Sequence, residues 1–167
     1  PKSVPLDKRM ESNFLGIQGQ LWTETVRNEE IFDELMYPNL IVLAEKAWSQ
    51  QDQWTKNLLS KNIDEIMNKE WSYFVNTLGH RTLNHLSLLF DGVDFDLPKP
   101  GGIIKNDTLF VNSVFPGMEV RYTRDGSISS PEDELYIKEI KVLSSESIVL
   151  RSFDQTGRGG RHIVVTK

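Results

Sequence analysis

Cysteine is absent from this chain of 167 residues, and so is any long uninterrupted apolar run. Without cysteine this chain forms no disulfide and has no thiolate to act as a nucleophile or a metal ligand. The lack of cysteine leaves the cellular compartment open. A membrane-spanning helix needs roughly 18 or more consecutive apolar residues. We therefore expect no membrane span.

An excess of positive charge is missing as well. The chain holds 19 Lys and Arg against 24 Asp and Glu, which gives a formal net charge of −5. No basic stripe is present to neutralise a phosphate backbone, and this excludes nucleic acid as a partner. The few histidines lack the carboxylate or serine partners of a catalytic triad and show no paired metal spacing: His80, His85 and His162.

Two further clusters lack the parts that a binding site needs. One is a group of three acids, Asp91, Asp94 and Asp96, which lacks the glycine and the terminal glutamate of a calcium-binding loop. The favoured interpretation is that these acids are exposed to solvent where the chain leaves the helix. The glycine-rich stretch 157–160 has neither the lysine nor the following helix of a phosphate loop, which favours a hairpin turn. We expect neither a metal nor a cofactor.

The chain starts with Pro1 and carries neither an initiating methionine nor a signal peptide, which predicts an internal or processed piece of something longer. Its length and 38% hydrophobic content suit one or two small domains.

The first zone of the chain mixes a strand with helices. The pattern predicts a strand over 14–21, then a short helix over 31–36 behind the N-cap candidate Asn28. A second helix is predicted from Pro38, whose fixed φ suits a first turn, to Trp48.

The second zone, residues 52–89, is predicted to be helical throughout. Asn62 followed by Glu65 forms a capping-box pattern, and an apolar stripe with the helical period follows it. Gly79 interrupts the stripe at a cost near 1 kcal/mol relative to alanine, which predicts a bend or a break. The large side chains Trp54, Met67 and Trp71 could line an aromatic binding site for a ligand. The favoured interpretation is that they belong to the apolar stripe through which the helix packs.

From Pro98 onward, proline and glycine punctuate short β-rich runs, as expected of a small antiparallel sandwich. The predicted strands are Thr108–Val111, Met118–Thr123, Leu135–Ile137, Ser147–Phe153 and Arg161–Thr166.

The segment Gly16–Glu24 carries the strongest functional signal. In a strand, Leu15, Ile17 and Leu21 share one face, while the polar residues and Trp22 share the other. Trp22 and Glu24, at i and i+2, would project together at the carboxyl end, where barrel enzymes bind ligands. An indole offers a flat wall for a sugar ring, and a carboxylate accepts hydrogen bonds from hydroxyls. The alternative is a core tryptophan beside a helix-flanking acid.

This segment, together with Tyr37-Pro38 and the stretch 44–49 (Ala-Glu-Lys-Ala-Trp-Ser), resembles the last barrel strand and helix of the family 20 glycoside hydrolases, the β-N-acetylhexosaminidases and chitobiases. The stretch 86–101 is similar to the exit from that catalytic domain. Tyr122–Ser127 (Tyr-Thr-Arg-Asp-Gly-Ser) is similar to the small β domain that ends bacterial chitobiases.

The resemblance implies an α+β fragment with three parts. Residues 1–50 would hold the last strand and helix of a (β/α)8 barrel, residues 51–97 a helical connector, and residues 98–167 a small antiparallel, Ig-like β-sandwich. A parallel strand without neighbours exposes backbone groups and an apolar face. We therefore expect this segment to be disordered, to pack against another copy of the fragment, or to belong to a longer protein whose missing N-terminal part of the barrel is its partner.

The resemblance also implies exo-acting hydrolysis of terminal N-acetylhexosamine from chitooligosaccharides or glycans by substrate-assisted retaining catalysis. Trp22 would form one wall of the sugar pocket, and Glu24 would bind the O4 and O6 hydroxyls. The family's catalytic Asp-Glu pair lies in an earlier H-x-G-G-D-E-like segment that this chain does not contain. We assign no catalytic residue here, expect the isolated fragment to be inactive, and favour a periplasmic or extracellular location. No catalytic role is assigned to the Asp-Glu pairs beginning at Asp33, Asp64 and Asp133.

A second hypothesis makes the chain a non-catalytic carbohydrate-binding or structural module. Clustered exposed aromatics on the sandwich would favour sugar binding. The aromatic side chains of this zone suit a core better, and a structural role is favoured: Phe110, Phe115, Tyr122, Tyr136 and Phe153.

Overall fold

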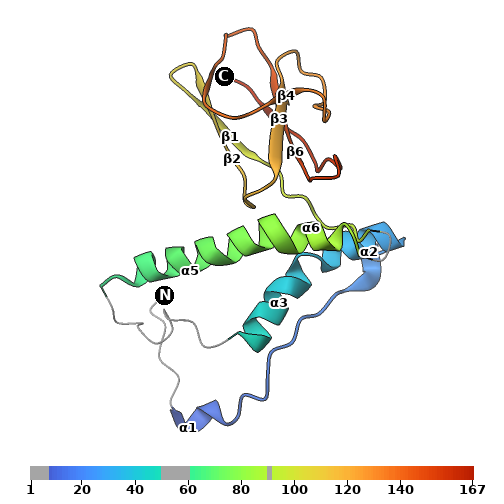
Figure 1. Ribbon diagram of the computed structural model, residues 1–167, viewed down its shortest axis with the longest axis vertical. Coiled ribbons are helices and arrows are strands. Elements are labelled where there is room, and N and C mark those ends of the chain that lie inside the picture. Colours follow the sequence, from blue (N-terminus) through green and yellow to red (C-terminus); the bar gives the residue numbers. More distant parts are fainter. Residues whose placement is uncertain (1–7, 50–60, 90–91) are drawn as a thin grey trace.

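A computed structural model describes residues 8–49, 61–89 and 92–167, and it separates a helical half from a β half (Figure 1). The helical elements are α1 (Lys8–Glu11), η1 (Thr23–Thr25), α2 (Glu29–Met36), α3 (Asn39–Trp48), α5 (Ile63–Thr77), η2 (Leu78–Thr82) and α6 (Leu83–Leu86). The strands are β1 (Gly101–Lys105), β2 (Thr108–Asn112), β3 (Glu119–Thr123), β4 (Glu134–Leu135), β5 (Ile140–Lys141), β6 (Ile148–Phe153) and β7 (Ile163–Val165). Within the described residues, no helix is long and apolar enough to cross a membrane.

The helices α2 and α3 begin close to where the sequence predicts. The Asn28 side chain accepts a hydrogen bond from the backbone N–H of Ile31 at 2.9 Å, which confirms it as the N-cap of α2. Pro38 stands at the N-cap of α3, one residue before the position expected. Tyr37 and Ile41, from the junction of these helices, pack against a buried cluster to which η2, α6 and residues from two later loops contribute.

The predicted strand over 14–21 is wrong for this chain. Residues 14–22 belong to no helix or strand, and η1 follows at Thr23. A strand is defined by hydrogen bonds to a neighbour, and the described residues supply none alongside this segment. Phe14, Leu15 and Ile17 are consequently exposed, Leu15 at 98% of its surface.

The elements α5, η2 and α6 form one continuous rod over residues 63–86, which we call the long helix (Figure 1). The predicted break at Gly79 does not occur, because the chain continues through a π turn over 78–82, although the regular α-helix does end at Thr77. The capping-box contact is also not formed: Asn62 stands at the N-cap of α5, but its side chain makes no cap bond. Residues 50–60, with Trp54, lie outside the described residues.

Gly79 has a packing role in place of a helix-breaking one. A methyl group at this position would overlap the carbonyl oxygen of Pro116 and lie 3.3 Å from Cβ of Phe115. At the neighbouring residue of the helix, Nδ1 of His80 would lie within 2.7 Å of a side chain added at Gly117, where φ is +89°. The loop 115–117 therefore lies directly on the long helix, at a distance that only glycine permits.

Residues 101–165, which we call the β unit, contain two antiparallel sheets with the orders β1-β2-β5 and β4-β3-β6-β7. The five predicted strands are present within two residues at each end, whereas β1 and β5 were not predicted. β1 was not recognised because it begins with Gly101 and Gly102, and glycine is depleted in strands. The side chains of both sheets meet in one core: Leu109, Val120, Tyr122, Val142, Ile148, Leu150 and Val165.

A second core joins the β unit to the helices. Its buried members are Leu78, Leu83, Leu86, Phe95, Leu97 and Phe115, so the long helix, the connection 92–97 and the loop 115–117 all contribute. The β unit and α3 lie on opposite sides of the long helix (Figure 1). Both are thereby held on one rod.

We predict that Gly79→Ala destabilises the chain by about 1–3 kcal/mol, because the added methyl group overpacks against the backbone of Pro116. The midpoint and slope of urea denaturation measure the change. At an open helical site the same substitution would stabilise by about 1 kcal/mol, and a gain of that size would contradict the contact. Gly16→Ala is the control, since a methyl group there meets nothing within 4 Å.

Candidate functional site

Trp22 and Glu24 lie in a turn between the extended segment 14–22 and α2. Trp22 precedes η1 with extended backbone angles (φ −87°, ψ 124°), and its side chain is 72% exposed. Glu24 lies inside η1 and is also exposed. The expectation that both residues project from one strand is therefore wrong in this chain, because a helical turn follows Trp22.

The extended segment is held by α3 at one point. A side chain at Gly19 would lie 2.9 Å from Cδ2 of Leu43, so the backbone passes directly over α3 there. Leu21, two residues later, is half-buried. The arrangement leaves the indole and the carboxylate free to contact another surface, and α3 supports only one side of the segment.

The Tyr122–Ser127 motif folds as a structural turn. Thr123 Oγ1 donates to the carbonyl of Ser127 at 2.5 Å, while Asp125 accepts hydrogen bonds from the backbone N–H and the hydroxyl of Ser127. These bonds lower the pKa of the Asp125 carboxyl. Gly126 supplies the positive φ of +84° that the turn requires.

The residue after Thr123 ties this turn to the next loop. Arg124 pairs with Glu146 at 3.0 Å, and the Glu146 carboxylate also accepts from the backbone N–H of Leu143 at 2.7 Å. The bond from Leu143 and the charge of Arg124 lower the pKa of Glu146. Every contact of the motif is thus internal to the β unit.

The aromatic side chains of the β unit are mostly used in its cores. Phe115, Tyr122 and Phe153 are buried, and Tyr136 is half-buried. The Tyr136 hydroxyl accepts from the Val111 N–H at 3.2 Å and lies 3.3 Å from the carbonyl oxygen of Leu109, to which it donates. It therefore pairs with backbone groups at the edge of β2, where the pairing of β2 with β5 ends at Leu109. Phe110, 40% exposed, is the single aromatic of this set that faces solvent.

A groove of about 460 Å³ opens beside Tyr136 between β2, β3 and β4. Its lining is mainly apolar, with Glu119 as its one carboxylate, and that carboxylate is paired with Arg121 at 2.6 Å. The groove therefore lacks a free pair of carboxylates. Among the described residues, no cluster of three or more His, Cys, Asp or Glu is suited to hold a metal ion.

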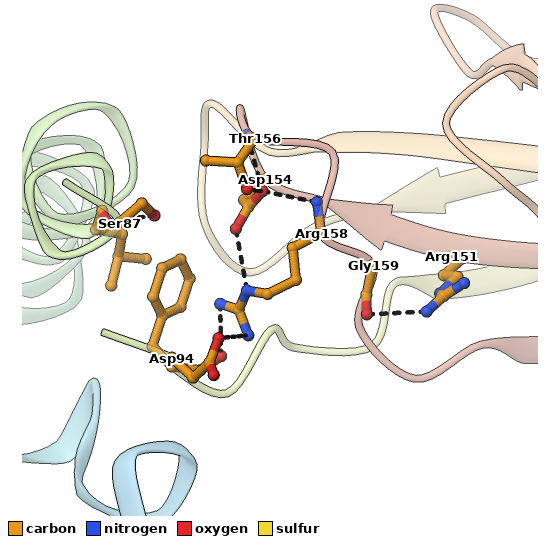
Figure 2. A network of polar contacts seen from close by, with 9 residues as sticks. Ser87, Asp94, Arg151, Asp154, Thr156, Arg158 and Gly159 are labelled. Carbon is orange, nitrogen blue, oxygen red and sulfur yellow. Dashed lines mark hydrogen bonds and ion pairs between the residues drawn. The ribbon is translucent and has the colours of Figure 1, made fainter. Parts of the chain in front are cut away.

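Arg158 is the strongest polar contact between the β unit and the connection 92–97 (Figure 2). Its Nη2 donates to the carbonyl of Phe95 at 2.9 Å, and its guanidinium lies 4.5 Å from the centre of the Phe95 ring. The same group pairs with Asp94 at 3.5 Å and Asp154 at 3.2 Å. Sequence reasoning treated Asp94 as solvated and missed Arg158, whose partner Phe95 lies 63 residues away.

Asp154 holds this arginine in place. Its carboxylate is buried and accepts from the N–H groups of Thr156 and Arg158 at 2.9 and 3.0 Å, and from the Thr156 hydroxyl at 2.7 Å. The hairpin expected from the glycines is present, but its turn lies at 154–158 and the stretch 157–160 forms the returning arm that carries Arg158. On the other side of the connection, the Asp96 N–H donates to the Tyr37 carbonyl at 3.1 Å.

Comparison with known proteins divides the chain between two families of domains. Residues 2–51 match the model of the glycosyl hydrolase family 20 catalytic domain, and residues 84–162 match that of the chitobiase/beta-hexosaminidase C-terminal domain. The chain is 33% identical over 123 residues to N,N'-diacetylchitobiase of Vibrio harveyi, an alignment that covers 68% of this chain and 14% of that protein.

Two hexosaminidases are also similar. The chain is 29% identical over 170 residues to a beta-hexosaminidase of Vibrio vulnificus, covering 92% of this chain and 19% of that protein. It is 28% identical over 79 residues to beta-hexosaminidase B of Pseudoalteromonas piscicida, covering 40% of this chain and 10% of that protein. The chain therefore spans at most 19% of the length of these relatives.

We predict that Arg158→Met destabilises the chain by about 1–3 kcal/mol, because the buried Asp154 loses its cation and the Phe95 carbonyl loses a donor. Urea denaturation measures the loss, and the NMR amide shifts of residues 94–96 follow the connection itself. The matched control is Arg161→Met, because Arg161 is exposed and makes no hydrogen bond or ion pair with the described residues, so its loss should change the stability by at most about 0.5 kcal/mol. Equal effects of the two substitutions would show that Arg158 does not hold the connection.

Proposed function

Because the chain belongs to the family 20 glycosyl hydrolases, with a segment of their catalytic domain followed by their C-terminal domain, we propose that it is part of an exo-acting β-N-acetylhexosaminidase. The complete protein removes terminal N-acetylhexosamine from chitooligosaccharides or glycans. The two matched domains, in this order along one chain, are the observation that carries the proposal.

In this proposal, Trp22 and Glu24 belong to the subsite for the terminal sugar. Both side chains are exposed on a turn that directly follows the extended segment 14–22, and so are available to a ligand. The indole provides an apolar wall for the ring or its acetamido group, and the carboxylate accepts hydrogen bonds from O4 and O6. Their alignment on one strand requires the rest of the barrel.

Completion of the barrel accounts for the exposed segment 14–22. Its backbone is already extended, and its apolar residues Leu15 and Ile17 are 98% and 56% exposed. Strands on both sides would pair its backbone groups and turn it into the last strand of the barrel. The missing N-terminal part of the catalytic domain is therefore the principal partner, and association of two fragments is the substitute when that part is absent.

The catalytic step belongs to residues outside this chain. We assign it to an Asp-Glu pair on an earlier strand of the family's barrel. The Asp orients the substrate acetamide, whose carbonyl oxygen attacks the anomeric carbon, and the Glu protonates the leaving oxygen. The Asp-Glu dipeptides present here lie in α2, in α5 and at β4.

We divide the chain into three functional parts: residues 1–50 as the end of the barrel, residues 51–97 as the connector, and residues 98–167 as the C-terminal domain. A structural role of this last domain is better supported than sugar binding. Its aromatic side chains fill cores or close a sheet edge, and Phe110 alone is exposed among the five singled out from the sequence.

We predict that Glu24→Gln in the complete enzyme lowers kcat/KM by about five- to 150-fold, or about 1–3 kcal/mol of transition-state binding. The amide keeps the size of the side chain and removes the charge that strengthens the hydrogen bonds to the sugar hydroxyls. Steady-state kinetics on a chromogenic N-acetylglucosaminide measure the change.

Glu45→Gln is the matched control for this experiment, because Glu45 is an exposed acid on the neighbouring helix α3. Its kcat/KM should equal that of the unaltered enzyme. An unchanged kcat/KM for Glu24→Gln would remove Glu24 from the subsite. The isolated chain should show no turnover of the same substrate, and measurable turnover would contradict the assignment of catalysis to an outside segment.

A further inference from the structure

The long helix has an apolar stripe of which one half is covered and the other is not. Phe74 packs against the second core, and Val75 and Leu78 are 6% and 2% exposed. One to two turns earlier, Trp71 and Met67 are 55% and 42% exposed. The five residues have the helical spacing that places them on one side of the helix.

The exposed half is a continuation of the covered one. The Trp71 ring lies 5.9 Å from the Phe74 ring at an angle of 39°, so Trp71 contacts a residue that packs against the second core. Tyr37 and Ile41 also pack against that core, and both come from the segment that matches the family 20 catalytic domain. The stripe thus extends an interface with the catalytic part beyond the residues that cover it here.

We propose that Met67 and Trp71 dock against the part of the family 20 catalytic domain that lies outside this chain. The inference rests on the proposed function. The long helix then acts as a brace: its second half carries the β unit through Gly79 and Phe115, and its first half lies on the barrel. The docking surface on the barrel is apolar, because the two side chains present a thioether and an indole.

A second copy of the chain fits this face less well. α5 carries three acids, Asp64, Glu65 and Glu70, against one base, Lys69. Pairing two such helices along the stripe brings like charges together, which destabilises the contact. The catalytic domain is therefore the occupant to which we commit.

Hydroxyl-radical footprinting of the complete protein and of this chain alone tests the proposal. Met67 and Trp71 should react about tenfold more slowly in the complete protein, because a packed interface core excludes water. Tyr73, 78% exposed in the chain alone, is the internal control and should react equally in both samples. Equal reactivity of Trp71 in the two samples overturns the proposal.

Other occupants give different patterns. Protection of Trp71 in the isolated chain that rises with protein concentration assigns the face to a second copy and overturns the proposal. Protection that requires added chitooligosaccharide assigns it to a sugar and overturns it as well. Protection in the complete protein without sugar, at every protein concentration, supports it.

Two substitutions in the complete protein give an independent measurement. Trp71→Asp should lower the melting temperature of the complete enzyme, whereas Tyr73→Asp should leave it unchanged. Equal melting temperatures of the two variants overturn the docking. Turnover of a chromogenic N-acetylglucosaminide by the unaltered complete protein distinguishes failure of the proposed function from failure of the docking. If the protein does not turn over this substrate, the proposed function is refuted. If it does, and Trp71 still reacts as fast as in the chain alone, only the docking is refuted.

Discussion

The arrangement of the two halves of this protein depends on the close packing of the loop 115–117 against the long helix at Gly79. A single methyl group at Gly79 would overlap the Pro116 carbonyl, and a side chain at Gly117 would collide with His80. The contact places Phe115 in the second core beside Leu78 and Leu83. Arg158 then fixes the connection 92–97 by binding the carbonyl and the ring of Phe95, which lies in the same core as Phe115. The orientation of the β unit follows from these two attachments.

The two halves of the chain differ in how completely they satisfy their own groups. The β unit pairs its strands in two sheets and buries a core of its own. The segment 14–22 has no paired neighbour among the described residues and leaves Leu15 98% exposed. This difference agrees with a chain that matches a C-terminal domain over 84–162 and only a segment of a much larger catalytic domain over 2–51. It also explains why Trp22 and Glu24 are accessible but not aligned.

Local signals in the sequence predicted the elements that local interactions determine. The cap at Asn28 and the five strands bounded by turn residues are of this kind, since each depends on residues within a few positions. Failures came where distant contacts decide. The strand over 14–21 depends on absent neighbours, the role of Gly79 depends on Pro116, and Arg158 was missed because Phe95 is 63 residues away. The candidate residues Trp22 and Glu24 were identified from a sequence motif, and the structure places a helical turn directly after Trp22 in place of the predicted strand.

Amide hydrogen exchange across the isolated chain tests the central claim most directly, namely that the β unit and the long helix form a self-sufficient body while the segment 14–22 depends on an outside partner. The account predicts strong protection for the amides of β3, β6 and α6, and exchange near the unprotected rate for residues 14–22. In the complete protein, residues 14–22 should become as slow as β6. Protection of residues 14–22 in the isolated chain, at the level of the β unit, would contradict the account.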